Sequence, residues 1–101
     1  MRVLMKVTMP HAKFNAAVKD GTATARMKRI LAELKPEAAY FTEFDGKRTG
    51  ILIVDLADPS QIPAMAEPWF LQFEADVEIH PAMTAEDLGK ANLDAVGRNW
   101  A

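Results

Sequence analysis

The dipeptide Asp45-Gly46 constrains the fold more than any other feature, because it lies between two runs rich in β-forming residues, Ala38–Phe44 and Arg48–Leu56. Asp-Gly in this setting is the strongest short-range signal for a β-hairpin. A two-residue loop also fixes the register, which places Glu43 opposite Arg48 as a favourable pair of opposite charges. The sequence therefore predicts an antiparallel hairpin at the centre of the chain.

Two other segments alternate between apolar and polar residues, as strands do. Residues 2–9 have one strictly apolar side and are ended by Pro10. Residues 75–80 alternate in the same way and are stopped by Pro81. Proline cannot donate a hydrogen bond to a sheet, so both segments are expected to be short strands.

Residues 11–35 have helical periodicity, but their two apolar stripes would lie on nearly opposite sides of one continuous helix. We expect a short first helix, a break at Gly21 and a main helix over roughly 23–35. Thr22 is expected to cap the start of the main helix.

Two more helices are predicted after the hairpin. One begins at Asp58 or Ser60, and its stripe places Trp69 and Phe70 in the core. Pro68 is expected to kink that helix or to restart it just before Trp69. The other spans 84–100 and begins with a capping box of Thr84 and Asp87; its weak apolar stripe predicts docking on its own domain or on a partner chain.

The order of these elements predicts an α+β protein of the ferredoxin-like βαββαβ type, with a C-terminal helix added. Residues 1–101 are expected to form a single domain, with a core over 2–80 and a helical extension over 84–100. The crossovers place both helical connections on one face of a four-stranded antiparallel sheet. The strand residues expected to point at the helices are Val3, Met5, Val7, Ala39, Phe41, Leu52, Val54, Val77 and Ile79.

The other face of the predicted sheet mixes apolar and polar side chains. It consists of Leu4, Lys6, Thr8, Tyr40, Thr42, Phe44, Lys47, Thr49, Ile51, Ile53, Asp55, Glu78 and His80. Such a face is too apolar to be left in water and too polar to be a dry core. We therefore predict a homodimer, in which two copies pack sheet against sheet about a two-fold axis and enclose a cavity lined by the polar residues.

Composition excludes several classes of protein. The 101 residues carry a formal charge of −2 and no cysteine, which excludes a disulfide scaffold, a thiol nucleophile and cysteine-ligated zinc or iron–sulfur centres. A slightly acidic chain has no electrostatic attraction to nucleic acid, and no apolar run approaches the ~18 residues of a membrane span. The first residues are not expected to form a signal peptide. We expect a soluble cytoplasmic protein without nucleic-acid or membrane partners.

The chain also resembles known families. The pattern of elements over residues 2–80 resembles the dimeric α/β-barrel superfamily. The chain resembles a family of small bacterial proteins of unknown function more specifically. This resemblance rests on three stretches of sequence: Pro36–Glu43 with Asp45–Arg48, Asp58–Pro63 with Ala66–Phe70, and Met83–Leu88. These resemblances imply the fold and no activity, because the superfamily includes monooxygenases without cofactor, isomerases, haem-handling enzymes and ligand-sensing modules.

His80 and Glu78 are the candidate catalytic residues, because they are two residues apart on one side of a strand. A histidine near a carboxylate can be oriented for proton transfer. A structural role is the alternative for both: His80 would be solvated at the strand end, and Glu78 would pair with a lysine on the next strand.

The candidate ligand-binding residues are Lys6, Tyr40 and Thr42 on the mixed face, and His11 at the exit of the first strand. Lys6 or Tyr40 could stabilise an anionic intermediate. No metal site and no cofactor are predicted. The sequence leaves two functions open: a homodimeric module that binds a small, partly apolar molecule or is only structural, and a cofactor-independent monooxygenase- or isomerase-type enzyme with His80 as base.

Overall fold

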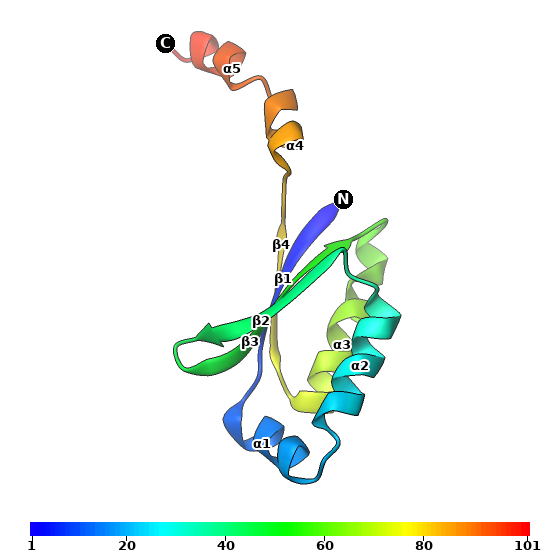
Figure 1. Ribbon diagram of the computed structural model, residues 1–101. Helices are drawn as coiled ribbons and strands as arrows, with labels where there is room; N and C mark the ends of the chain where they lie inside the picture. Colours follow the sequence, from blue (N-terminus) through cyan, green and yellow to red (C-terminus); the bar gives the residue numbers. More distant parts are fainter.

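The computed structural model describes residues 1–101 as an α+β fold with one four-stranded antiparallel sheet in the order β2-β3-β1-β4 (Figure 1). The strands are β1 (Arg2–Thr8), β2 (Ala38–Phe44), β3 (Lys47–Asp55) and β4 (Asp76–Pro81). The helices are α1 (His11–Lys19), α2 (Ala23–Leu34), the 3₁₀ turn η1 (Pro59–Gln61), α3 (Ile62–Phe73), α4 (Ala85–Lys90) and α5 (Leu93–Asn99). None of the helices combines the length and the apolar character needed to traverse a bilayer.

The hairpin forms in the predicted register. Glu43 pairs with Arg48 across β2 and β3, and both loop residues have positive φ, 54° at Asp45 and 76° at Gly46. Positive φ at both positions is the property of a type I′ turn, whose twist matches that of the strands. The Gly46 amide also donates a 2.8 Å hydrogen bond to the Glu43 carboxylate, which fixes the turn further.

Helices α2 and α3 lie side by side on one face of the sheet (Figure 1). The core between them and the sheet is formed by strand and helix residues that are almost fully buried: Val3, Met5, Val7, Leu52, Val54, Ile30, Trp69 and Phe73. Of the strand residues predicted to face the helices, Phe41 alone remains about half exposed, because β2 is an edge strand. The Phe14 ring joins the core from α1, 5.0 Å from the ring of Phe73.

The predicted break between α1 and α2 is confirmed, with Gly21 at φ 80°. Thr22 is the N-cap residue of α2, as predicted, but its side chain makes no cap hydrogen bond to the helix. Its hydroxyl and its amide instead donate to the Asp20 carboxylate, at 2.6 and 2.9 Å. These two hydrogen bonds lower the pKa of Asp20, because they stabilise the charged carboxylate.

Helix α3 runs through Pro68 as one helix. Of the two predicted outcomes, a kink or a restart before Trp69, the restart therefore does not occur. The proline removes one backbone donor, but Met65, Trp69 and Phe73 on either side of it are buried and hold the helix to the sheet. Phe70 is exposed rather than in the core, since it lies outside the stripe that these three residues define.

The segment predicted as one helix over 84–100 consists of two helices, α4 and α5. The capping box of Thr84 and Asp87 is present at the start of α4, as expected. Asn92 then takes a left-handed conformation, with φ 51°, and its side chain accepts a 3.4 Å hydrogen bond from the Ala95 amide. Asparagine tolerates this conformation and is a good N-cap, which explains why the helix stops and restarts there.

Replacing Gly21 with valine tests the break between α1 and α2. A β-branched residue is strained at φ 80°, even though no atom lies within 4 Å of the added Cβ. We expect a loss of roughly 1–2 kcal/mol in the free energy of unfolding, measured by urea titration. Thr24→Val, at an exposed position of α2, is the control and should be nearly neutral. Equal stability of the two variants would contradict the strained backbone.

Asp58 gives the fold a specific dependence on pH. Its carboxylate accepts a 2.8 Å hydrogen bond from the Ser60 amide at the start of η1, and this bond lowers the pKa of Asp58. The stabilisation is therefore present above the unfolded pKa of about 3.9 and is lost as pH falls through the lower folded value.

Asp58→Asn keeps an acceptor for the Ser60 amide but cannot ionise. The melting temperature of the unaltered chain should exceed that of Asp58→Asn near neutral pH, and the difference should shrink below about pH 4. Thermal melts of both proteins between neutral and acidic pH measure this difference. A difference that is constant over the whole range would show that Asp58 does not titrate as described.

Candidate functional site

The face of the sheet opposite α2 and α3, here called the open face, has no helix packed over it (Figure 1). The strand register arranges its side chains in rows across β4, β1, β3 and β2: His80, Leu4, Ile53 and Ala38; then Glu78, Lys6, Ile51 and Tyr40; then Asp76, Thr8, Thr49 and Thr42. Phe44 and Lys47 lie beyond the third row. Leu4 and Ile53 occupy the middle of the first row, Lys6 and Ile51 the middle of the second, and Tyr40 is 69% exposed.

Three of the predicted site residues meet on this face. Lys6 and Glu78 are direct partners in the β1–β4 register, with Lys6 Nζ 3.8 Å from Glu78 Oε2. The other oxygen of Glu78 lies 3.3 Å from His80 Nε2. Glu78 therefore connects a cation on β1 to an imidazole on β4. A carboxylate in this position can orient the imidazole of His80, which is what the proposed proton transfer requires.

Tyr40 does not join this cluster. It lies in the same row as Lys6, but Ile51 of β3 separates them, so their backbones are about 10 Å apart. The aromatic residue that meets Lys6 is Phe44, whose ring centroid is 4.7 Å from Lys6 Nζ. Sequence reasoning missed this contact, because the flat register separates Lys6 and Phe44 by β3 and by two rows, and only the twist of the assembled sheet brings them together.

The other two candidate ligand-binding residues lie apart from the cluster. Thr42 is opposite Thr49 in the third row and is exposed. His11 is the first residue of α1, beyond the end of β1, and its exposed side chain makes no hydrogen bond or ion pair. The structure therefore does not bring His11 together with His80, Glu78 or Lys6.

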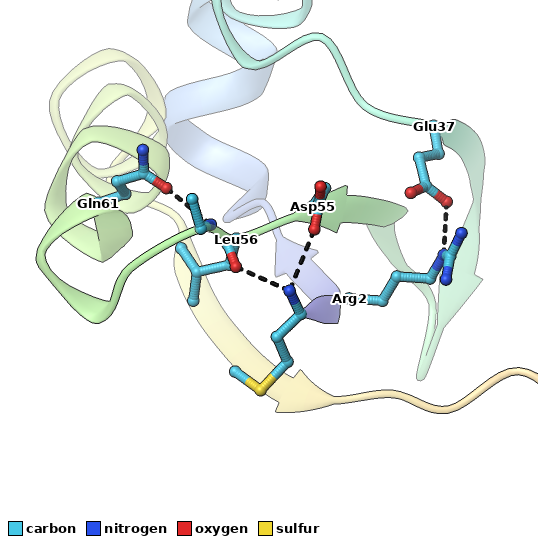
Figure 2. A network of polar contacts seen from close by, with 7 residues as sticks. Arg2, Glu37, Asp55, Leu56 and Gln61 are labelled. Atoms are coloured by element: carbon cyan, nitrogen blue, oxygen red, sulfur yellow. Dashed lines mark hydrogen bonds and ion pairs between the residues drawn. The ribbon is translucent and has the colours of Figure 1, made fainter. Parts of the chain in front are cut away.

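A hollow of about 330 Å³ adjoins the open face at the end where β4 finishes. It is lined by Arg2, Glu37, Ala38, Ile53, Ala82, Met83 and Thr84. Arg2 Nε donates a 2.9 Å hydrogen bond to Glu37 Oε2, spanning β3 (Figure 2). This bond raises the pKa of Arg2 above its usual value. Residues alternate between the two faces of β1, so Arg2 lies on the same face as Leu4. This alternation could have identified Arg2 as a residue of the open face from the sequence.

The start of β1 is also held by the end of β3. The amino group of Met1 donates to the Leu56 carbonyl at 2.9 Å and lies 3.2 Å from the Asp55 carboxylate (Figure 2). Residues 37–56 contain β2 and β3. Arg2 binds the first residue of this segment, Glu37, and Met1 binds the last, Leu56. Of the residues that line the hollow, Arg2 and Glu37 are held in place by their mutual hydrogen bond.

The cluster of Lys6, Glu78 and His80 lines none of the hollows in a single chain. Lys6 is the most sheltered of the three, and the side chains of Glu78 and His80 are more than half exposed. No group of three or more histidine or acidic side chains is placed to hold a metal ion. In one copy the cluster is a surface feature with a defined geometry.

The chain belongs to the family described as a domain of unknown function, DUF3303, which matches residues 1–96. The match includes all four strands, the open face and most of α5. No curated protein matches the sequence.

Proposed function

We propose that this chain is a ferredoxin-like domain that pairs through its open face into a dimeric α/β barrel, and that the chamber between the two sheets binds a small, partly apolar molecule. The strand order β2-β3-β1-β4 supports the fold, together with the packing of α2 and α3 on one face only. The family match leaves the activity open, so the proposal is argued from the open face.

The observation that carries the proposal is the apolar part of that face. Leu4, Ile51 and Ile53 are only half-buried, while Tyr40 and Phe44 are exposed. Full burial of an apolar side chain of this size contributes about 1.5–3 kcal/mol. Each of these two side chains is already partly buried, so covering it would contribute about half of that value. Covering Tyr40 and Phe44 in both copies would thus contribute on the order of 3–6 kcal/mol in total. A second copy offers the matching surface by symmetry.

The composition of the face indicates the class of ligand. The charge of Lys6 is balanced by Glu78, and the neighbouring surface is formed by isoleucine, leucine and aromatic side chains. Small-molecule sites are mostly apolar, with a few polar groups that fix the orientation of the ligand. A molecule with an apolar body and one polar end fits this arrangement.

Ile51→Asp tests the pairing. The aspartate would place an unpaired charge at the middle of the interface, so we expect a folded monomer instead of a dimer. Native mass spectrometry measures the mass of the complex, and the unaltered dimer should carry a bound small molecule that Ile51→Asp lacks. Leu71→Asp is the control, because Leu71 is exposed on α3, on the helical side of the sheet.

The control should remain a dimer with its ligand. A dimer that persists in Ile51→Asp would contradict the use of the open face. Circular dichroism of Ile51→Asp shows whether the chain is still folded, so that loss of the dimer can be assigned to the interface.

We propose as the second function a cofactor-independent reaction of the monooxygenase or isomerase type, in which His80 removes a proton from carbon. It is favoured by the 3.3 Å contact of His80 with Glu78 and the 3.8 Å contact of Glu78 with Lys6. In this mechanism Glu78 orients the imidazole, and Lys6 stabilises the anion that proton removal creates.

A test of this second function uses 5-nitrobenzisoxazole, an apolar molecule whose C–H bond is cleaved by a base while its N–O bond opens to a phenolate. The unaltered protein should accelerate the reaction, His80→Ala should abolish the acceleration, and Glu78→Gln should reduce it about 10–100-fold. Glu33→Gln, on the exposed surface of α2, should react like the unaltered chain. Equal rates for His80→Ala and the unaltered protein would eliminate His80 as a base.

A further inference from the structure

Residues 82–101, here called the arm, extend away from the rest of the protein beyond the end of β4 (Figure 1). No residue of α4 or α5 is buried. The radius of gyration is 16.9 Å, whereas a compact domain of this length has about 13 Å. The longest dimension, 59 Å, is twice the next, 29 Å. The arm therefore leaves its apolar side chains in water.

The apolar side chains of the arm are too many for a segment that stays solvated. The exposed ones are Met83, Leu88, Leu93, Val96 and Trp100, and Trp100 is 83% exposed. Helices as short as α4 and α5 are marginal in water even with good caps, because too few hydrogen bonds offset the cost of nucleation. Both helices are capped, so their sequence specifies helix, and what they lack is a surface to pack on.

A second exposed apolar surface lies on the β2–β3 hairpin. Tyr40, Phe41 and Phe44 are all exposed, and they project from both faces of the edge strand β2. Figure 1 shows the turn of this hairpin at the opposite end of the sheet from the arm. Within one chain the arm points away from it.

We propose that the arm of one copy packs on the aromatic hairpin of the other copy, so that each subunit contributes Trp100 and Leu93 to the wall of its partner's chamber. This inference rests on the proposed homodimer and specifies how the chamber is closed. The arm starts at the margin of the open face, where Met83 and Thr84 line the hollow beside Arg2. The surface of the arm is thus continuous with the proposed interface.

The area needed for a stable dimer supports a second copy as the occupant. Four strands about 4.8 Å apart and about 20 Å long present a footprint of roughly 400 Å². A standard stable interface buries about 800 Å² on each partner. The arm's helices, of 6 and 7 residues, together are about 20 Å long and 10 Å wide, so one arm would cover about 200 Å² of its partner and bury as much of its own surface. The exchanged arms would therefore add to the area that the open face buries and bring the total closer to that of a standard stable interface.

The two tryptophans provide a direct test without any substitution. Trp69 is fully buried and Trp100 is 83% exposed in one copy, so the fluorescence that acrylamide can quench reports Trp100. We expect the quenchable fraction to fall several-fold as the protein concentration is raised through the monomer–dimer transition, which sedimentation equilibrium locates independently.

The chain has no cysteine, so engineered pairs can locate the contact. When Phe44→Cys and Trp100→Cys proteins are mixed and oxidised, we expect a disulfide between the two variants, because Phe44 is exposed on the open-face side of the hairpin. Arg29→Cys mixed with Trp100→Cys is the control and should give no such product, because Arg29 is exposed on α2, on the helical side.

The outcomes separate this inference from the proposed homodimer. A dimer in which Trp100 remains as quenchable as in the monomer overturns the arm exchange and leaves the dimer standing. Protection of Trp100 at every concentration, the monomer included, would place the arm on its own chain and also overturns it. A chain that stays monomeric at all concentrations overturns both proposals.

Discussion

The pleat of the sheet is the constraint on which the rest of this structure depends. Successive residues of a strand point to opposite faces, so β1 presents Val3, Met5 and Val7 to one side and Leu4 and Lys6 to the other. The chain provides helices for the first side only, where Trp69 and Phe73 complete a tightly packed core. Everything proposed about function concerns the second side, where Tyr40 and Phe44 are exposed to water.

Covering that side would change the chemistry of the polar residues on it. Lys6 and Glu78 already form an ion pair, so their burial does not leave a charge without a partner. Removal of water would strengthen their interaction and the contact of Glu78 with His80, because the local dielectric constant falls. The same pairing step that stabilises the protein would therefore convert a surface cluster into an enclosed site.

Much of the fold could be predicted because it is decided by local rules. Asp45-Gly46 fixes the turn and with it the register, and Gly21 takes the positive φ that the two conflicting helical stripes require. Two local predictions failed because a nearby side chain makes a hydrogen bond that the prediction did not take into account. Asp20 engages the hydroxyl of Thr22 that was expected to cap α2, and Asn92 starts a new helix where a single one was expected.

Contacts between distant residues were beyond the reach of the sequence for a different reason. Helix α3 continues through Pro68 because its burial against the sheet compensates for the missing hydrogen bond, and that burial is a property of the tertiary structure. The contact of Lys6 with Phe44, and the reach of Arg2 across β3 to Glu37, require the twist and spacing of the assembled sheet. Of the candidate site, alternation alone grouped His80, Glu78 and Lys6 correctly, since all three lie on neighbouring strands.

Tyr40 is the only tyrosine in the chain and lies on the open face, 69% exposed in a single copy. The rate at which tetranitromethane nitrates it therefore measures whether that face is covered. The account predicts that at high protein concentration Tyr40 reacts at least ten times more slowly than a free tyrosine, and that dilution restores the rate. A Tyr40 that reacts as fast as free tyrosine at every concentration would contradict the central claim that a second copy shelters this face.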